Sequence, residues 1–185
     1  MAERINIIGQ RSKRGWNYGA NILCNRRGPL GAGKTTVSKE LSRRYNAAHI
    51  SIDEILEKFN LEEWEDDHIS ETSFLSANEI AVKEAKEYLY SGKPVIFDGN
   101  FYFRRGVVDL TNGLSKFRGV VITLTLSLAE CIRRDASRSL VLGEEGTRMV
   151  YKKSTEFRIG IEVDANRGLN EVVASISGII GDKLE

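Results

Sequence analysis

The residues with the most specific spacing for chemistry form a glycine-rich loop. Residues 28–35 read GPLGAGKT, which matches the pattern GxxxxGK[ST], and Val37 and Leu41 follow at helical spacing. Glycines let backbone amides point inward around a phosphate group, in conformations that a Cβ atom would obstruct. Lys34 supplies a cation for the β- and γ-phosphate oxygens, and Thr35 a hydroxyl for Mg²⁺. The loop therefore predicts binding of ATP with Mg²⁺. The predicted ATP-binding residues here are Gly28, Leu30, Gly31, Ala32, Gly33, Lys34, Thr35 and Thr36.

Two carboxylates follow apolar runs that are typical of buried strands. Asp53 comes directly after residues 49–52, and Asp98 closes residues 94–97. Ligands bind beyond the carboxyl ends of parallel strands, so both acids are candidates for the site. Asp53 can order an acceptor hydroxyl and accept its proton, or it can cap a helix over residues 54–59. Asp98 can hold Mg²⁺, or it can form a turn with Gly99.

Two arginines, Arg134 and Arg138, are four residues apart on a helix that Ser127 and Glu130 open as a capping box. We expect them on one helical face, where planar guanidinium groups can stabilise charge on a γ-phosphoryl group. The alternative is a solvated basic face. The following residues 139–146, with two glycines and no aromatic residue, predict a mobile lid, about residues 134–148 in all.

The elements that position these residues alternate between strands and helices. Helical spacing is typical of the segments that begin near Val37, Phe74, Val108, Ser127 and Leu169. This alternation predicts a three-layer α/β fold with a parallel five-stranded sheet. At the end of the last strand, Asp164 and Asn166 either meet an adenine edge or form an ordinary turn. The predicted strands cover residues 20–24, 49–52, 94–98, 120–126 and 159–164.

Composition limits the remaining possibilities. The chain has 185 residues, a length that predicts a single domain over residues 1–185. Its 27 Lys+Arg and 26 Asp+Glu nearly balance, so we expect no general attraction to nucleic acid. No run approaches the roughly 20 apolar residues of a membrane span, and no signal peptide is recognisable, so we expect a cytoplasmic protein. Cys24 and Cys131 are expected to be buried thiols. Residues 1–27 are basic and atypical, because Arg26 and Arg27 precede the loop where a buried strand should end.

With these residues in place, the chain from Gly28 onward resembles P-loop kinases of the nucleoside-kinase-like group, especially polynucleotide-kinase-like and zeta-toxin-like ATPases. Residues 98–105, DGNFYFRR, resemble a DxN motif followed by paired arginines, and residues 148–152, RMVYK, resemble a lid motif. The resemblance implies that Asp53 is the general base and that Arg138 contacts the γ-phosphate. It also implies acceptor binding by Asp98, Asn100, Arg104 and Arg105. Residues 161–167 resemble the adenine-binding end of shikimate kinases, but DGN replaces their GGG turn, so a shikimate substrate is not expected.

The sequence departs from the polynucleotide kinases where those enzymes grip nucleic acid. Leu56 stands where they have an arginine, and residues 62–67 are EEWEDD, which would repel a phosphodiester strand. Residues 101–103, FYF, are expected to seat a helix on the sheet rather than to stack on a substrate, and no chemistry is assigned to His49 or His68.

The sequence therefore predicts an ATP-dependent phosphotransferase that acts on a hydroxyl of a small molecule, with Lys34, Asp53, Arg134 and Arg138 as catalytic residues and Thr35 and Asp98 at the metal. Three alternatives stay open. They are a polynucleotide 5′-hydroxyl kinase, a nucleoside monophosphate kinase, and a regulatory ATP-binding protein without acceptor turnover.

Overall fold

Short strands and longer helices alternate along the chain. The computed structural model describes residues 20–21, 28–65, 68–138 and 141–184, so Cys24 and nearly all of the atypical segment 1–27 lie outside the described residues. The strands are β1 (Ala20–Asn21), β2 (Ala48–Ser51), β3 (Trp64–Glu65), β4 (His68–Ile69), β5 (Val95–Asp98), β6 (Arg118–Gly119), β7 (Ile122–Thr125) and β8 (Ile161–Asp164). The helices are α1 (Lys34–Tyr45), α2 (Ile52–Lys58), α3 (Glu71–Tyr90), α4 (Arg104–Gly113), α5 (Leu128–Asp135), α6 (Gly143–Thr155) and α7 (Leu169–Leu184).

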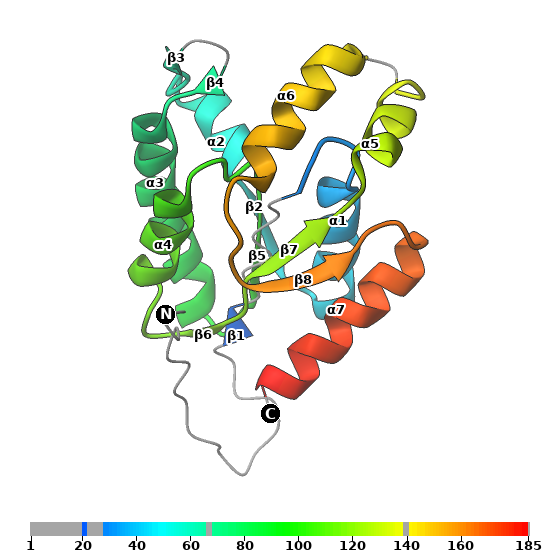
Figure 1. Cartoon of the computed structure of the whole chain (residues 1–185). Helices are drawn as coiled ribbons and strands as arrows, with labels where there is room; N and C mark the ends of the chain where they lie inside the picture. Colours follow the sequence, from blue (N-terminus) through cyan, green and yellow to red (C-terminus); the bar gives the residue numbers. More distant parts are fainter. Residues whose placement is uncertain (1–19, 22–27, 66–67, 139–140, 185) are drawn as a thin grey trace.

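The main strands pair in parallel, as the sequence predicts for an α/β fold. β2 pairs with β5, β7 with β8, and β1 with β6, while β3 and β4 form a small antiparallel hairpin. Helices α3 and α4 lie on one side of these strands and α1 and α7 on the other, which gives three layers (Figure 1). The fold class is therefore confirmed. A continuous five-stranded sheet stays a prediction, because the described strands pair two by two.

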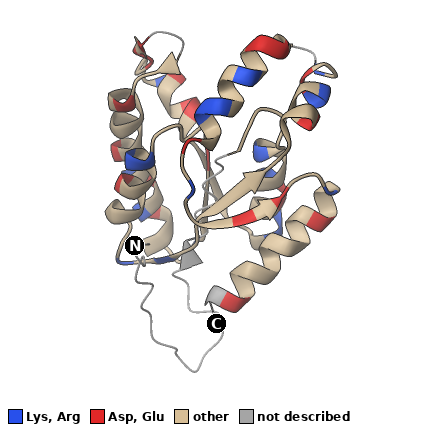
Figure 2. Ribbon diagram, viewed as in Figure 1, with Lys and Arg blue, Asp and Glu red and all other residues tan. Residues whose placement is uncertain are grey.

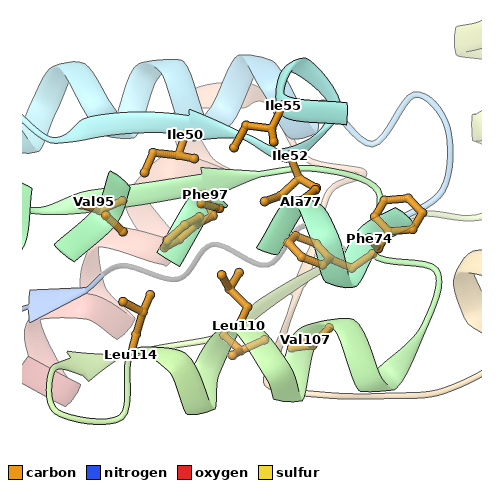
Figure 3. Packing of buried hydrophobic residues seen from close by; sticks show 14 of the residues in the cluster. Ile50, Ile52, Ile55, Phe74, Ala77, Val95, Phe97, Val107, Leu110 and Leu114 are labelled. Atoms are coloured by element: carbon orange, nitrogen blue, oxygen red, sulfur yellow. The ribbon is translucent and has the colours of Figure 1, made fainter. Parts of the chain in front are cut away.

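β5 shows why the strands form the central layer. Its side chains alternate between the two faces: Val95 and Phe97 pack into one apolar cluster, and Ile96 packs into another. All three are fully buried, as expected for a parallel strand covered on both sides. The first cluster joins β2 and β5 to helices α2, α3 and α4, and Figure 3 shows Phe97 among residues of these helices, including Phe74 and Leu110.

The second cluster joins β7 and β8 to helices α1 and α7. Val37 and Leu41 contribute from α1, and the α7 residues Val172, Val173, Ile176 and Ile180 are buried, as their helical spacing predicts. Leu169 is different: the helix begins there, and its side chain is 40% exposed, so it does not belong to the buried face that the helical spacing would give it. Cys131 is a buried free thiol, as predicted, and burial raises its pKa to about 11.

Helix boundaries correct two local predictions. Ser51, not Asp53, caps α2, since the Ser51 side chain accepts a hydrogen bond from the Glu54 backbone amide at 3.2 Å. Ser127 caps α5 as predicted, but this helix ends at Asp135, so Arg138 does not share a helical face with Arg134. Residues 143–148, the last part of the predicted lid, lie in helix α6, and the mobility of the lid stays a prediction.

No helix in the described part of the chain is both long and apolar enough to cross a membrane.

Candidate active site

The glycine-rich loop leads into the N-terminus of α1. Gly31 and Gly33 have φ angles of 80° and 78°, in the left-handed region that favours glycine. Gly33 caps α1, and its carbonyl accepts the backbone amide of Val37 at 2.9 Å. A Cβ atom built at Gly28 would lie 2.8 Å from the Leu124 carbonyl oxygen, whereas one at Gly33 would meet no atom within 4 Å. The loop thus packs against β7 at its beginning and opens onto space at the helix N-terminus, where backbone amides attract an anion.

Lys34 folds back over the loop that precedes it. Its Nζ atom donates to the carbonyl oxygens of Gly28 at 2.9 Å and Pro29 at 3.4 Å. Thr35 and Thr36 are exposed at the start of α1. The ammonium group therefore lies inside the curve of the loop. If a phosphate bound there, its charged oxygens would replace the carbonyl oxygens as the hydrogen-bond acceptors of Lys34.

Arg134 fixes the loop from the opposite side. Its guanidinium group donates to the Gly31 carbonyl oxygen at 3.1 Å, to the Ala165 carbonyl oxygen at 2.9 Å and to Glu130 Oε1 at 2.7 Å. These contacts join the loop, α5 and the turn that follows β8. Arg134 thus holds the loop against the turn that the sequence predicts at the adenine edge.

Asp164 and Asn166 of that turn bind each other. The Asp164 carboxylate accepts the backbone amide of Asn166 at 2.9 Å and also its side-chain amide, and this backbone hydrogen bond is the main cause that lowers the pKa of Asp164. Both side chains are exposed. Asp164 and Asn166 therefore form a turn, which was one of the two predicted possibilities. Ala165 lies between them and supplies the carbonyl oxygen that accepts a hydrogen bond from Arg134.

Asp53 lies in the first turn of α2 and is held by Asn100. The Asn100 backbone amide donates to Asp53 Oδ1 at 3.3 Å, and its side-chain amide donates to Oδ2 at 3.2 Å. The carboxylate is open to a cleft but crowded by its walls, and this desolvation is the main cause that raises its pKa. The Asn100 hydrogen bond and the Lys34 charge oppose the rise, whereas the charges of Asp98 and Glu62 add to it. A carboxylate with a raised pKa is a better proton acceptor.

Asp98 ends β5 beside this group and is only 4% exposed. His49 Nε2 lies 3.6 Å from Asp98 Oδ2 and 2.8 Å from Ser38 Oγ. His49 is on β2 and Ser38 on α1, so the imidazole ties both elements to the acid. Sequence reasoning gave His49 no role, because the parallel pairing of β2 with β5 is what brings it to Asp98.

The donors near the loop fit a magnesium ion bound together with nucleotide phosphates. Mg²⁺ prefers oxygen ligands, keeps several waters and takes one or two carboxylates beside substrate phosphates. Thr35 offers an exposed hydroxyl at the start of α1, and Asp98 offers a carboxylate close enough to Asp53 to raise its pKa. Thr35 and Asp98 therefore stay the predicted protein ligands.

Arg138 lies in the turn after α5. Its Nη1 atom is 3.8 Å from Oδ1 of the buried Asp135, and its side chain is about half exposed. Asp135 also accepts the backbone amides of Leu142 at 3.3 Å and Gly143 at 2.9 Å. The buried carboxylate at the end of α5 thus caps the start of α6. The predicted γ-phosphate contact of Arg138 requires it to leave Asp135.

A cleft of about 740 Å³ opens beside Asp53 and Asn100. One wall comes from α2, α3 and the β3–β4 hairpin, and the other from α6 and the residue before it. Glu62 of the acidic segment lines this cleft, and Lys152 and Lys153 line it as well, a contribution that sequence reasoning missed. Volumes of this size are typical of small-molecule sites.

Arg104 and Arg105 line an adjoining cleft rather than the one that holds Asp53. Both are exposed in the first turn of α4, and Arg105 lies 3.9 Å from Glu71. This neighbouring cleft, about 490 Å³ in volume, shares Tyr102 and Glu156 with the first. If Arg104 and Arg105 contact the acceptor as predicted, they do so in the adjoining cleft and not in the cleft that Asp53 lines.

The aromatic run at residues 101–103 divides between core and cleft. Phe101 is 2% exposed and packs in the core, as expected for a residue that seats a helix. Tyr102 packs edge-on against Phe74 and lines both clefts. Burial, and then the charge of Asp53, raise the pKa of Tyr102 to about 12, so its hydroxyl stays protonated near the acid.

Comparison with protein families gives one match: a family of AAA domains matches residues 23–154. This segment contains the loop, Asp53, Asp98 and most of α6. Comparison with curated proteins found no match.

Several solved structures share the fold. A gluconokinase from Sinorhizobium meliloti 1021 has a TM-score of 0.63 at 14% identity, with 91% of this chain and 94% of that chain covered. A sugar kinase from Janibacter sp. HTCC2649 has a TM-score of 0.66 at 13% identity, with 89% and 94% covered. A shikimate kinase from Acinetobacter baumannii, solved with shikimate, has a TM-score of 0.56 at 23% identity, with 92% and 97% covered. At these identities the likeness establishes the fold.

Proposed function

The chain belongs to the AAA-domain family and has the fold of P-loop kinases, and from this premise we propose that it transfers the γ-phosphoryl group of Mg-ATP to a hydroxyl of a small molecule. The observation that carries the proposal is the position of Asp53. The Asp53 carboxylate is held by Asn100 and lines the cleft, and the charge of Lys34 in the phosphate loop is close enough to lower its pKa. An acceptor and a phosphate donor can therefore meet at one place.

Each residue has a role that its contacts support. Bound Mg-ATP supplies the phosphoryl group and the metal charge, and Thr35 and Asp98 would hold the ion. Lys34 exchanges the Gly28 and Pro29 carbonyl oxygens for phosphate oxygens, where its charge stabilises the transferring group.

Asp53 is the proposed general base. It accepts a hydrogen bond from the acceptor hydroxyl, orients the oxygen for in-line attack and takes the proton as the new P–O bond forms. The bond between the γ-phosphorus and the β–γ bridging oxygen breaks in the same step, and ADP leaves. Asn100 keeps the carboxylate in one orientation, because it binds both carboxylate oxygens. Arg134 holds the phosphate loop through the Gly31 and Ala165 carbonyl oxygens, so it contributes to the affinity for ATP rather than to the affinity for the acceptor.

A small acceptor is favoured over a nucleic acid. The cleft at Asp53 has the volume of a small-molecule site, and Glu62 on its wall would repel a phosphodiester. The structures that share the fold include a gluconokinase, a sugar kinase and a shikimate kinase, which is consistent with a small alcohol as acceptor.

The proposal is tested by following the γ-phosphate of labelled ATP in the presence of Mg²⁺. The acceptor is varied across small alcohols, nucleosides, nucleoside monophosphates and 5′-hydroxyl oligonucleotides. Lys34→Ala serves as the inactive variant and Lys39→Ala, an exposed lysine on the same helix, as its matched control. We expect transfer to small alcohols by the wild type and by Lys39→Ala, and none by Lys34→Ala. ATP binding with only slow release of phosphate to water, across all acceptors, would instead indicate a regulatory ATP-binding protein.

A further inference from the structure

Exposed apolar side chains gather on both walls of the Asp53 cleft. Trp64 on β3 is 64% exposed, Leu142 before α6 is 52% exposed, and Met149 on α6 is 48% exposed; all three line the cleft. In sequence they come from two segments about 80 residues apart, which Figure 1 shows side by side at one end of the molecule. Large apolar side chains left in contact with water on facing walls mark a binding surface for an apolar body.

The lining of the cleft mixes apolar and polar side chains. Leu56, Ile69 and Phe74 line it together with the exposed apolar residues, and its polar lining residues are Asp53, Glu62, His68, Asn100, Tyr102, Lys152, Lys153 and Glu156. A hydroxyl group placed against the apolar part of the walls would lose its hydrogen bonds to water, which costs binding energy. The cleft therefore fits an acceptor with an apolar body that lies between the exposed apolar side chains and polar groups that lie elsewhere.

Of the two lysines on the α6 wall, Lys152 is the one that can bind an anion. Lys153 pairs with Glu156 at 3.6 Å and lies over the Phe103 ring at 5.0 Å, so its charge is partly used within the protein. Lys152 is exposed and lines the cleft, and within the described ranges its ammonium group has no hydrogen bond or ion pair. Figure 2 shows the basic residues of α6 following the acidic ones of its first turn.

Lys152 and Asp53 lie on opposite walls of the cleft. Asp53 is on α2 and Lys152 is on α6, and both line the cleft. An acceptor that spans the cleft can therefore place its hydroxyl at Asp53 and an anionic group at Lys152, where opposite charges attract.

We propose, on the premise of the kinase activity above, that the acceptor is a hydroxy acid with a flat apolar ring. The hydroxyl lies at Asp53, the ring lies between Trp64 and Met149, and the acid group binds Lys152. Trp64 and Met149 provide the flat and the adaptable apolar surfaces that hold a ring.

The first experiment compares acceptors that differ in one property. The probes are 4-(hydroxymethyl)benzoate, its uncharged isostere 4-(hydroxymethyl)benzamide, and the polyhydroxy acids D-gluconate and shikimate. We expect the benzoate to have a kcat/KM about tenfold above the benzamide and at least tenfold above either polyhydroxy acid. A higher kcat/KM for gluconate or shikimate would overturn the inference while it supports the kinase function.

The second experiment tests the residues that bind the ring and the acid. Lys152→Met should raise the KM for the benzoate about tenfold and leave the benzamide unchanged, whereas Lys83→Met, an exposed lysine on α3, should change neither. Met149→Ser should raise the KM for both aryl alcohols, and Leu169→Ser, an exposed apolar residue outside the cleft, should not. An equal effect of Lys152→Met on both probes would contradict the assigned acid site.

A binding measurement keeps the two proposals separable. The chain has two tryptophans, so a Trp16→Phe background leaves Trp64 as the only source of tryptophan fluorescence. We expect 4-(hydroxymethyl)benzoate to quench this fluorescence in a saturable way, with weaker binding in Lys152→Met. Saturable quenching without phosphoryl transfer would support the recognition and contradict the kinase function, and transfer to small alcohols with no quenching by the benzoate would do the reverse.

Discussion

Replacing Asn100 by alanine should weaken catalysis through Asp53 without affecting ATP binding. The variant removes the side-chain amide that donates to Asp53 Oδ2 at 3.2 Å, and it keeps the backbone amide that donates to Oδ1 at 3.3 Å. A hydrogen bond to a charged group contributes about 1.5–3 kcal/mol, and this solvent-exposed pair should contribute about 1 kcal/mol. That corresponds to a loss of about fivefold in kcat/KM at neutral pH, more if the carboxylate also turns away.

The pH dependence gives the variant its distinctive signature. Asp53 acts as a base only when it is ionised, so kcat/KM falls as the pH drops through its pKa, which desolvation already raises above the ordinary value for aspartate. Without the Asn100 side chain the ionised form loses a donor, so its pKa rises further and the acidic limb of the profile moves to higher pH.

The assay is kcat/KM measured against pH for the wild type, Asn100→Ala and Asn112→Ala, an exposed asparagine on α4. We expect the acidic limb to move only in Asn100→Ala. A limb that stays in place, or one that moves to lower pH, would refute the reasoning that Asn100 stabilises the ionised base.

Three further predictions concern the nucleotide loop and α6. Gly31→Ala should weaken ATP binding about tenfold, because Gly31 has a φ of 80° and a Cβ there would lie 3.1 Å from the Arg134 Cβ; calorimetric binding that matches wild type would contradict this. Arg134→Ala frees the loop from Ala165 and should raise the Kd of ATP about tenfold with an unchanged acceptor KM, so a change confined to the acceptor KM would count against it. Asp135→Ala leaves the Gly143 amide without its acceptor and should lower the free energy of unfolding by about 1–3 kcal/mol, with faster hydrogen exchange at the start of α6; unchanged exchange there would be evidence against the cap.

Local patterns allowed much of the fold to be predicted. The glycine loop and α1 are adjacent in sequence, so their spacing alone predicts a phosphate site at a helix N-terminus. β5 is apolar on both faces, which is why the run ending at Asp98 is recognisable as a central strand. The capping box at Ser127 likewise predicts where α5 begins, because a cap is a contact between near neighbours.

The features that sequence reasoning placed wrongly or missed depend on contacts beyond near neighbours. α5 ends at Asp135, whose carboxylate accepts the amides of residues 142–143, and no periodicity indicates this contact. The link from Ser38 through His49 to Asp98 arises only when β2 pairs with β5. The walls of the cleft come from a short hairpin and from α6, so neither its apolar character nor its lysines can be read from the segment around Asp53.

The most direct test of the central claim is a single-turnover measurement of phosphoryl transfer by Asp53→Asn, with ATP binding measured in parallel. Asparagine keeps the size of the side chain but cannot take the proton. We expect transfer to fall by about 10² to 10⁴ while the Kd of ATP stays within a few-fold of wild type. Transfer at a rate close to wild type, or a loss of ATP binding as large as that of Lys34→Ala, would contradict the assignment of Asp53 as the base.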